Sequence, residues 1–176
     1  GFVVPLVRSV PCPSDPWQIA RRVIEREETA FFLDSVRPQG ETSRYSYLGW
    51  NPFRIFRLPQ INGYSNGSSS GVVSRLRNLF RPYRGRRWPE FPFFTGGAAG
   101  YFSYELRRAF EHLPARAADD LELDSAVLLF VRDLLVFDLK DRKWFVISNL
   151  VPGLDGTFQE ALERARGAIE EKTKEF

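Results

Sequence analysis

The 176-residue chain has 43% hydrophobic and 15% aromatic residues, enough apolar surface for a folded core, so disorder is excluded. Its 25 basic and 22 acidic residues leave a net charge of only +3, which by itself indicates no polyanionic partner. The single cysteine, Cys12, excludes an internal disulfide and favours a reducing compartment. No apolar run approaches the roughly 20 residues that span a bilayer, and the start lacks a signal-peptide pattern. We therefore expect a soluble cytoplasmic protein.

The first half of the chain predicts one helix followed by three strands. Asp15 and Pro16 supply a cap and a first-turn proline, and Trp17, Ala20 and Ile24 then recur at helical spacing, which predicts a helix over 15–28. Short aromatic and apolar runs then predict a buried strand over 29–35, a strand over 44–50 and a half-exposed strand over 53–58.

The second half begins with a Gly- and Ser-rich stretch over 60–71, which predicts a flexible loop. Apolar residues at helical spacing predict helices over 73–83 and from Phe158 onward, and the glycines over 95–104 indicate close backbone approach. The apolar runs over 126–138 and 144–150 predict a hairpin. With no repeat visible, we interpret 1–176 as a single domain with a largely β core.

Few residues suggest catalysis or metal binding. The only histidine, His112, has no nucleophile or partner nearby in sequence, so a surface or capping role is favoured over acid–base work. An acidic cluster matches no calcium loop and is more typical of a solvated turn; its members are Asp119, Asp120, Glu122 and Asp124. We assign no catalytic and no metal-binding residue, and no cofactor, to this chain.

Arginines from Arg75 to Arg87, interleaved with aromatic residues, suggest a nucleic-acid-binding surface as one hypothesis. The helical phase places Phe80 and Tyr83 on the expected buried face, so an ordinary cationic helix face is the favoured interpretation. Gly96, Gly97 and Gly100 lack the Lys-Ser/Thr of a phosphate-binding loop, and we discount nucleotide binding.

Asp34 and Ser35 end the predicted buried strand. An acid facing an apolar interior needs a cation or hydrogen-bond donors, and a bound ammonium group would satisfy it. From spacing alone, a pair that caps the turn before Pro38 is the favoured alternative.

Three blocks of sequence stand out: Phe31-Phe32-Leu33-Asp34-Ser35, Ser43-Arg44-Tyr45-Ser46 through Pro52, and Gly96 through Leu106 with Phe110-Glu111. In order and spacing they resemble component I of the aminodeoxychorismate and anthranilate synthases, which use chorismate. The similarity extends from about Trp17 to Leu150, within the family's N-terminal domain. It implies an α+β fold of antiparallel sheets packed as a sandwich with peripheral helices.

The resemblance also implies a function. In the family, chorismate, Mg²⁺ and the catalytic residues lie mainly in a C-terminal domain absent from this chain, so the chain alone should not be an active enzyme. The N-terminal domain packs on that domain and contributes to a tryptophan pocket, which implies that Asp34 and Ser35 meet the ammonium group while Tyr45 and Ser46 line the pocket. A glutamine amidotransferase subunit is the other implied partner.

Two branches of the family remain open. Asp34 stands where many feedback-regulated members have Glu, and the Phe-Phe-Leu-Asp-Ser block is more similar to the aminodeoxychorismate branch, in folate synthesis. Our main hypothesis is therefore a regulatory and scaffolding domain of an aminodeoxychorismate synthase, with the anthranilate synthase of tryptophan synthesis as the alternative. A nucleic-acid-binding module using Arg75 to Arg87 and a stand-alone amino-acid sensor are hypotheses of other classes.

Overall fold

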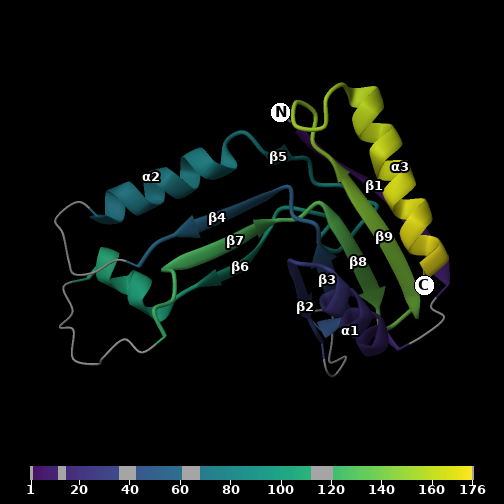
Figure 1. The fold of residues 1–176 in the computed structure, drawn as a ribbon, viewed down its shortest axis with the longest axis horizontal. Helices are drawn as coiled ribbons and strands as arrows, with labels where there is room; N and C mark the ends of the chain where they lie inside the picture. The colour runs from purple at the N-terminus through teal and green to yellow at the C-terminus, as the bar shows by residue number, and fades with distance from the viewer. Residues whose placement is uncertain (1, 12–14, 36–42, 61–67, 112–120, 176) are drawn as a thin grey trace.

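The computed structural model describes residues 2–11, 15–35, 43–60, 68–111 and 121–175, and in these residues two β-sheets and four helices are seen (Figure 1). The strands are β1 (Phe2–Pro11), β2 (Ala30–Leu33), β3 (Tyr45–Trp50), β4 (Arg54–Leu58), β5 (Arg84–Gly85), β6 (Ala98–Phe102), β7 (Ala126–Phe130), β8 (Asp133–Asp138) and β9 (Lys143–Leu150). The helices are α1 (Pro16–Arg26), α2 (Ser68–Phe80), the 3-10 helix η2 (Tyr104–Ala109) and α3 (Phe158–Glu175).

The larger sheet has six strands in the order β2-β3-β8-β9-β1-β5. All its pairings are antiparallel except the short parallel pairing of β5 with the start of β1. Its centre is the β8–β9 hairpin, in which Asp138 pairs with Lys143 and every residue of β8 is buried. A strand buried on both faces needs packing partners on each side of the sheet.

Helices α1 and α3 cover one face of this sheet (Figure 1). Leu135 and Phe137 of β8 pack there with Leu48 of β3, Ile19 of α1 and Ile169 of α3. The opposite face, which carries the alternate residues of each strand, packs against Phe93, Phe94 and the end of the second sheet.

The second sheet has three strands in the order β4-β7-β6 and extends away from the first, with α2 lying along it (Figure 1). Leu128 and Phe130 of β7 pack beneath Leu79 of α2. Gly100 of β6 lies so close to β7 that a Cβ atom there would be 1.9 Å from the carbonyl oxygen of Val127. The predicted close backbone approach is therefore confirmed.

The α+β class, the antiparallel sheets and the peripheral helices are confirmed. Helix α1 begins where predicted, since the Asp15 carboxylate accepts a hydrogen bond from the Trp17 backbone at 3.1 Å. Of the three residues whose spacing predicted this helix, Ala20 is buried whereas Trp17 and Ile24 are exposed, and Ile19 and Val23 complete the buried face. Among the described residues, none of the helices combines the length and the apolar character that a membrane crossing requires.

Two boundaries also differ from the prediction. The apolar run 126–138 is not one strand: it divides at Val131 and Arg132, where the chain leaves the small sheet as β7 and enters the large one as β8. Helix α2 begins at Ser68, within the stretch predicted as a loop, and residues 61–67 of that stretch lie outside the described residues. A continuous apolar run does not show which sheet each part joins.

Strand β1 was missed. Pro5 and Pro11 lie within it, and proline normally argues against a strand because it lacks a backbone N–H. Residues Val4 to Pro11 pair with β9, whereas β5 pairs only with Phe2 and Val3. From Val4 onward β1 is therefore an edge strand, the position in which proline is tolerated.

Candidate amino-acid site

Pairing of β2 with β3 brings the predicted site residues together. Leu33 at the end of β2 lies opposite Tyr47, so Asp34 and Ser35 continue beyond the ladder toward Tyr45 and Ser46 at the start of β3. Strand β2 is an edge strand with a half-exposed pattern, so the prediction that it is buried was wrong. Asp34 is exposed and does not face an apolar interior.

The Ser46 hydroxyl joins three of these residues. It donates a hydrogen bond to Asp34 Oδ1 at 2.9 Å and accepts one from the Ser35 backbone N–H at 3.0 Å. The Ser35 hydroxyl donates to the carbonyl oxygen of Tyr45 at 2.9 Å. Ser46 is fully buried, so its hydroxyl positions Asp34 and the Ser35 backbone from within the sheet.

Among the described residues, one carboxylate oxygen of Asp34 has no hydrogen-bond partner. Only Oδ1 accepts a hydrogen bond from Ser46, and in the part of the chain that the structure describes no lysine or arginine forms an ion pair with Asp34. An exposed carboxylate held in one orientation by a buried hydroxyl is suited to accept hydrogen bonds from a cationic group.

The Tyr45 ring lies on the other face of the sheet. Tyr45 and Tyr47 belong to the cluster of Phe93, whereas Leu48 packs with α1, and side chains alternate between faces along a strand. The ring centroids of Tyr45 and Phe93 are 5.4 Å apart in an edge-to-face arrangement. The structure thus gathers Asp34, Ser35 and Ser46, while Tyr45 contributes a backbone carbonyl to that group and presents its ring on the opposite side.

A buried ion pair fixes the start of β3. The Arg44 guanidinium donates to both carboxylate oxygens of Asp138, at 2.9 and 2.6 Å, and to Asp141 at 2.7 Å. The hydrogen bond to Asp138 raises the pKa of Arg44 above its usual value. Burial acts to raise the pKa of Asp138, but the hydrogen bonds from Arg44 and the Asp141 backbone outweigh it and lower that pKa. Arg44, the residue before Tyr45, is therefore held against the β8–β9 turn.

His112, Asp119, Asp120 and Cys12 fall outside the described residues. Asp124 forms an ion pair with Arg57 at 3.2 Å, and the described residues contain no cluster of His, Cys, Asp and Glu able to hold a metal ion.

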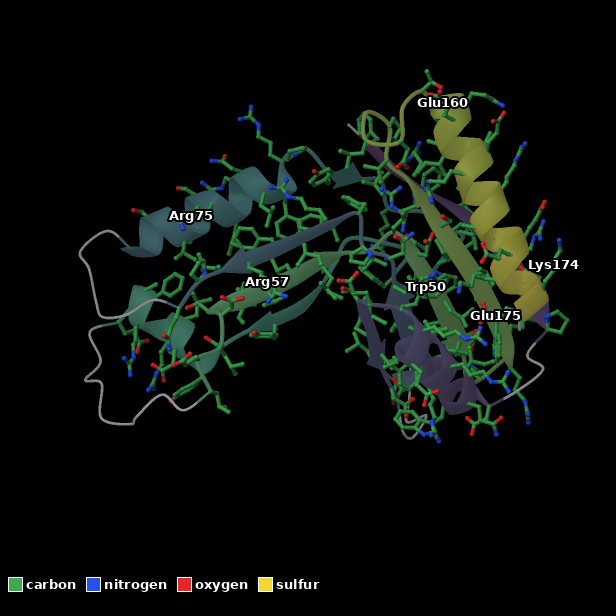
Figure 2. The ribbon with its side chains drawn as sticks, in the orientation of Figure 1. Trp50, Arg57, Arg75, Glu160, Lys174 and Glu175 are labelled. Carbon is green, nitrogen blue, oxygen red and sulfur yellow. The ribbon has the colours of Figure 1, made fainter. Side chains whose placement is uncertain are left out.

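The arginines of the α2 segment are exposed on the side of the molecule that carries the small sheet. Figure 2 shows Arg75 on α2 and Arg57 on the neighbouring strand. Phe80 and Tyr83 instead pack against Phe130, each with ring centroids 5.2 Å away. The predicted inward direction of these two rings is confirmed, although Phe80 remains 40% exposed.

Comparison with known proteins points to one enzyme family. No protein-family model matches the chain. It is 34% identical over 133 residues to anthranilate synthase component 1 of Acetivibrio thermocellus, which covers 72% of this chain and 27% of that protein. It is also 34% identical over 143 residues to the Thermus thermophilus protein of the same name, covering 80% of this chain and 30% of that protein. The protein of that name from Mycolicibacterium smegmatis matches 98% of this chain and 35% of its own length, at 26% identity.

This chain belongs to component I of the chorismate-utilising synthases. It corresponds to the N-terminal region of component I and spans 27 to 35% of the length of the relatives named above. The family resemblance inferred from the motifs is therefore confirmed. All three of these relatives are anthranilate synthase components, which favours the anthranilate branch over the aminodeoxychorismate branch that the motifs had favoured.

Sequence reasoning missed two parts of this candidate site. Arg44 stood inside the quoted Arg-Tyr-Ser block, and Asp138 ended a predicted strand, but their pairing depends on β3 and β8 being neighbours. Phe93 lay in a stretch broken by prolines and gave no periodic signal. Contacts across 94 residues, as between Arg44 and Asp138, require the strand order, which local patterns do not contain.

Proposed function

We propose that this chain is the N-terminal regulatory and scaffolding region of an anthranilate synthase component I, and that its β2–β3 edge contributes to a tryptophan-type amino-acid pocket. The supporting observation is the exposed Asp34 carboxylate: the buried Ser46 hydroxyl holds Oδ1, and no other described residue bonds to this carboxylate. In this proposal the Asp34 carboxylate accepts hydrogen bonds from the ammonium group of the amino acid. The hydrogen bonds of Ser35 and Ser46 hold the Asp34 carboxylate and the neighbouring backbone in place. The Tyr45 ring packs with Phe93 on the opposite face of the sheet, so in this proposal Tyr45 takes part in the pocket through its backbone carbonyl, which accepts a hydrogen bond from the Ser35 hydroxyl.

The anthranilate branch is proposed because the named relatives are anthranilate synthase components. The aminodeoxychorismate alternative rests on the Phe-Phe-Leu-Asp-Ser block, in which Asp34 is one methylene shorter than Glu. A shorter acid still forms the same charged hydrogen bond when a neighbouring donor fixes its direction, as Ser46 does here.

The chemistry itself we assign to the remaining, C-terminal region of component I, with chorismate and Mg²⁺ bound there and a glutamine amidotransferase subunit supplying ammonia. Exposed apolar side chains on β6, on η2 and in the segments beside them support docking of that region on this chain. These residues are Tyr101, Phe102, Tyr104, Phe110, Leu121 and Leu123, which are 41 to 73% exposed.

Titration with tryptophan tests the pocket. We expect the chain to bind tryptophan and Asp34→Asn to bind it at least tenfold more weakly, because the ammonium group loses a charged acceptor. Glu28→Gln removes the same charge from an exposed residue near β2 and should leave the affinity unchanged. Equal affinities of the two variants would remove Asp34 from the site.

Reconstitution tests the enzyme assignment. The chain mixed with the separately expressed catalytic region of a component I relative should restore ammonia-dependent conversion of chorismate to anthranilate. Formation of aminodeoxychorismate instead would assign the chain to the other branch. Tryptophan binding with no association between the two parts would favour a stand-alone sensor.

A further inference from the structure

A second pocket lies between α2, β1 and the segment that leads into β6. Its cavity volume is about 90 Å³ and it opens to solvent, which leaves room for part of a small molecule. Aromatic rings from separate segments line it, and these are Phe53, Phe80, Tyr83, Trp88 and Phe130. Several of these rings contact each other, with the Phe53 and Tyr83 centroids 5.1 Å apart in an edge-to-face arrangement. Such walls accept a flat ring by further edge and face contacts.

The polar part of the lining carries positive charge. Arg86 is exposed on the lining and has no acidic partner among the residues that the structure describes. Arg54, beside the pocket, has its guanidinium 5.8 Å from the Tyr83 ring centroid. No Asp or Glu belongs to the lining. A guanidinium with an unoccupied donor face favours a carboxylate, which it can bind through two parallel hydrogen bonds.

The floor of the pocket is closely fitted. The Asn149 side-chain amide donates to the carbonyl oxygens of Thr95 and Val131, each at 3.2 Å, so the amide group is held in one orientation. Gly96 lies against it, since a Cβ atom at Gly96 would be 2.8 Å from Asn149 Oδ1. The polar floor is therefore fixed before any ligand enters, which lowers the entropic cost of binding.

We propose that this pocket binds a single-ring aromatic carboxylate, with the ring against the packed cluster of Phe53, Tyr83 and Phe130 and the carboxylate on Arg86. The pocket is separate from the Asp34 group. Ser46 pairs with Phe137 near one end of β8, whereas the Asn149 backbone N–H bonds to Arg132, just before the other end. The assignment does not depend on the tryptophan-type pocket proposed above.

The test uses benzoate as the probe and the quenching of tryptophan fluorescence or calorimetry as the readout, since Trp88 lines the pocket. Benzoate should bind, whereas cyclohexanecarboxylate, which has the charge without the flat ring, and benzyl alcohol, which has the ring without the charge, should each bind at least tenfold more weakly. Arg86→Gln should weaken benzoate at least tenfold. Arg81→Gln changes an exposed arginine outside the lining by the same charge and should leave the affinity within twofold.

Three results would overturn the proposal. The first is no benzoate binding to the unmodified chain at millimolar concentration. The second is an equal loss in Arg86→Gln and Arg81→Gln, which would show attraction to the general positive charge. The third is a loss in Asp34→Asn with none in Arg86→Gln, which would place the ligand at the β2–β3 edge. Both arginines are exposed, so the variants should fold like the parent chain.

Discussion

Replacing Ser46 with alanine tests the hydrogen-bonded group at the β2–β3 edge. The change removes a donor to Asp34 and an acceptor for the Ser35 N–H, at 2.9 and 3.0 Å. Each such bond contributes about 0.5–1.5 kcal/mol net. The exposed Asp34 carboxylate regains water, whereas the half-buried Ser35 N–H does so poorly. We expect a loss of about 2 kcal/mol in the free energy of unfolding.

The measurement is urea unfolding at neutral pH, followed by circular dichroism. A loss of about 2 kcal/mol corresponds to a fall of about 4–8 °C in melting temperature for a chain of this size. Ser9→Ala is the matched control, because Ser9 is an exposed serine on strand β1, and it should change stability by less than about 0.5 kcal/mol. If the two variants have the same stability, the Ser46 hydroxyl does not join Asp34 to Ser35 and the reasoning is refuted.

Three further predictions concern the sheet, the ion pairs and the arginine surface. Gly100→Ala should lower the free energy of unfolding by about 2 kcal/mol or more, because its Cβ atom would lie 1.9 Å from the Val127 carbonyl oxygen. Asp155→Asn should cost about 2 kcal/mol at pH 7, because it leaves the half-buried Arg132 guanidinium without its charged partner. Burial acts to raise the pKa of Asp155, but the hydrogen bonds from Arg132 and a backbone N–H lower it, so this stabilisation is present above pH about 4 and should vanish as the pH falls through the lowered pKa. A single-stranded oligonucleotide should not bind at physiological salt, even though Arg75 is exposed, since the aromatic rings of that segment pack inward.

Each of these three predictions has a control variant or an outcome that would contradict it. Gly71→Ala, in helix α2 with nothing within 4 Å of the added Cβ, should stabilise the chain by about 0.5–1 kcal/mol, and an equal loss in both glycine variants would contradict the close approach of β6 and β7. For Asp155, urea midpoints at pH 7 and pH 3 should differ more in the parent chain than in Asp155→Asn. For the oligonucleotide, the measurement is its electrophoretic mobility in the presence of the chain. A salt-dependent mobility shift that disappears when Arg75, Arg77 and Arg81 are replaced by Glu would support the nucleic-acid hypothesis.

Local signals predicted most of the elements. The Asp15 cap and first-turn proline located α1, and the turn at 139–142 located the β8–β9 hairpin, because both signals lie within a few residues. The division of the chain between two sheets at Val131 was not predictable, since strands of either sheet show the same apolar run. The edge position of β1 is a property of the assembled sheet, which is why Pro5 was misleading.

The site was predicted in part. The motifs selected Asp34, Ser35, Tyr45 and Ser46, and pairing of β2 with β3 brings them to one end of the sheet. The strand period of two places the Tyr45 ring opposite the Ser46 hydroxyl, which could be derived only once β3 was known to have a packed layer on each face. The Arg44–Asp138 pair follows from strand order, which local sequence does not specify.

A crystal structure of this chain with bound tryptophan would test the proposed function most directly. The account predicts the ammonium nitrogen about 3 Å from a carboxylate oxygen of Asp34, with the Ser46 hydroxyl still bonded to Oδ1. Tryptophan bound elsewhere on the chain, with Asp34 facing only water, would contradict it.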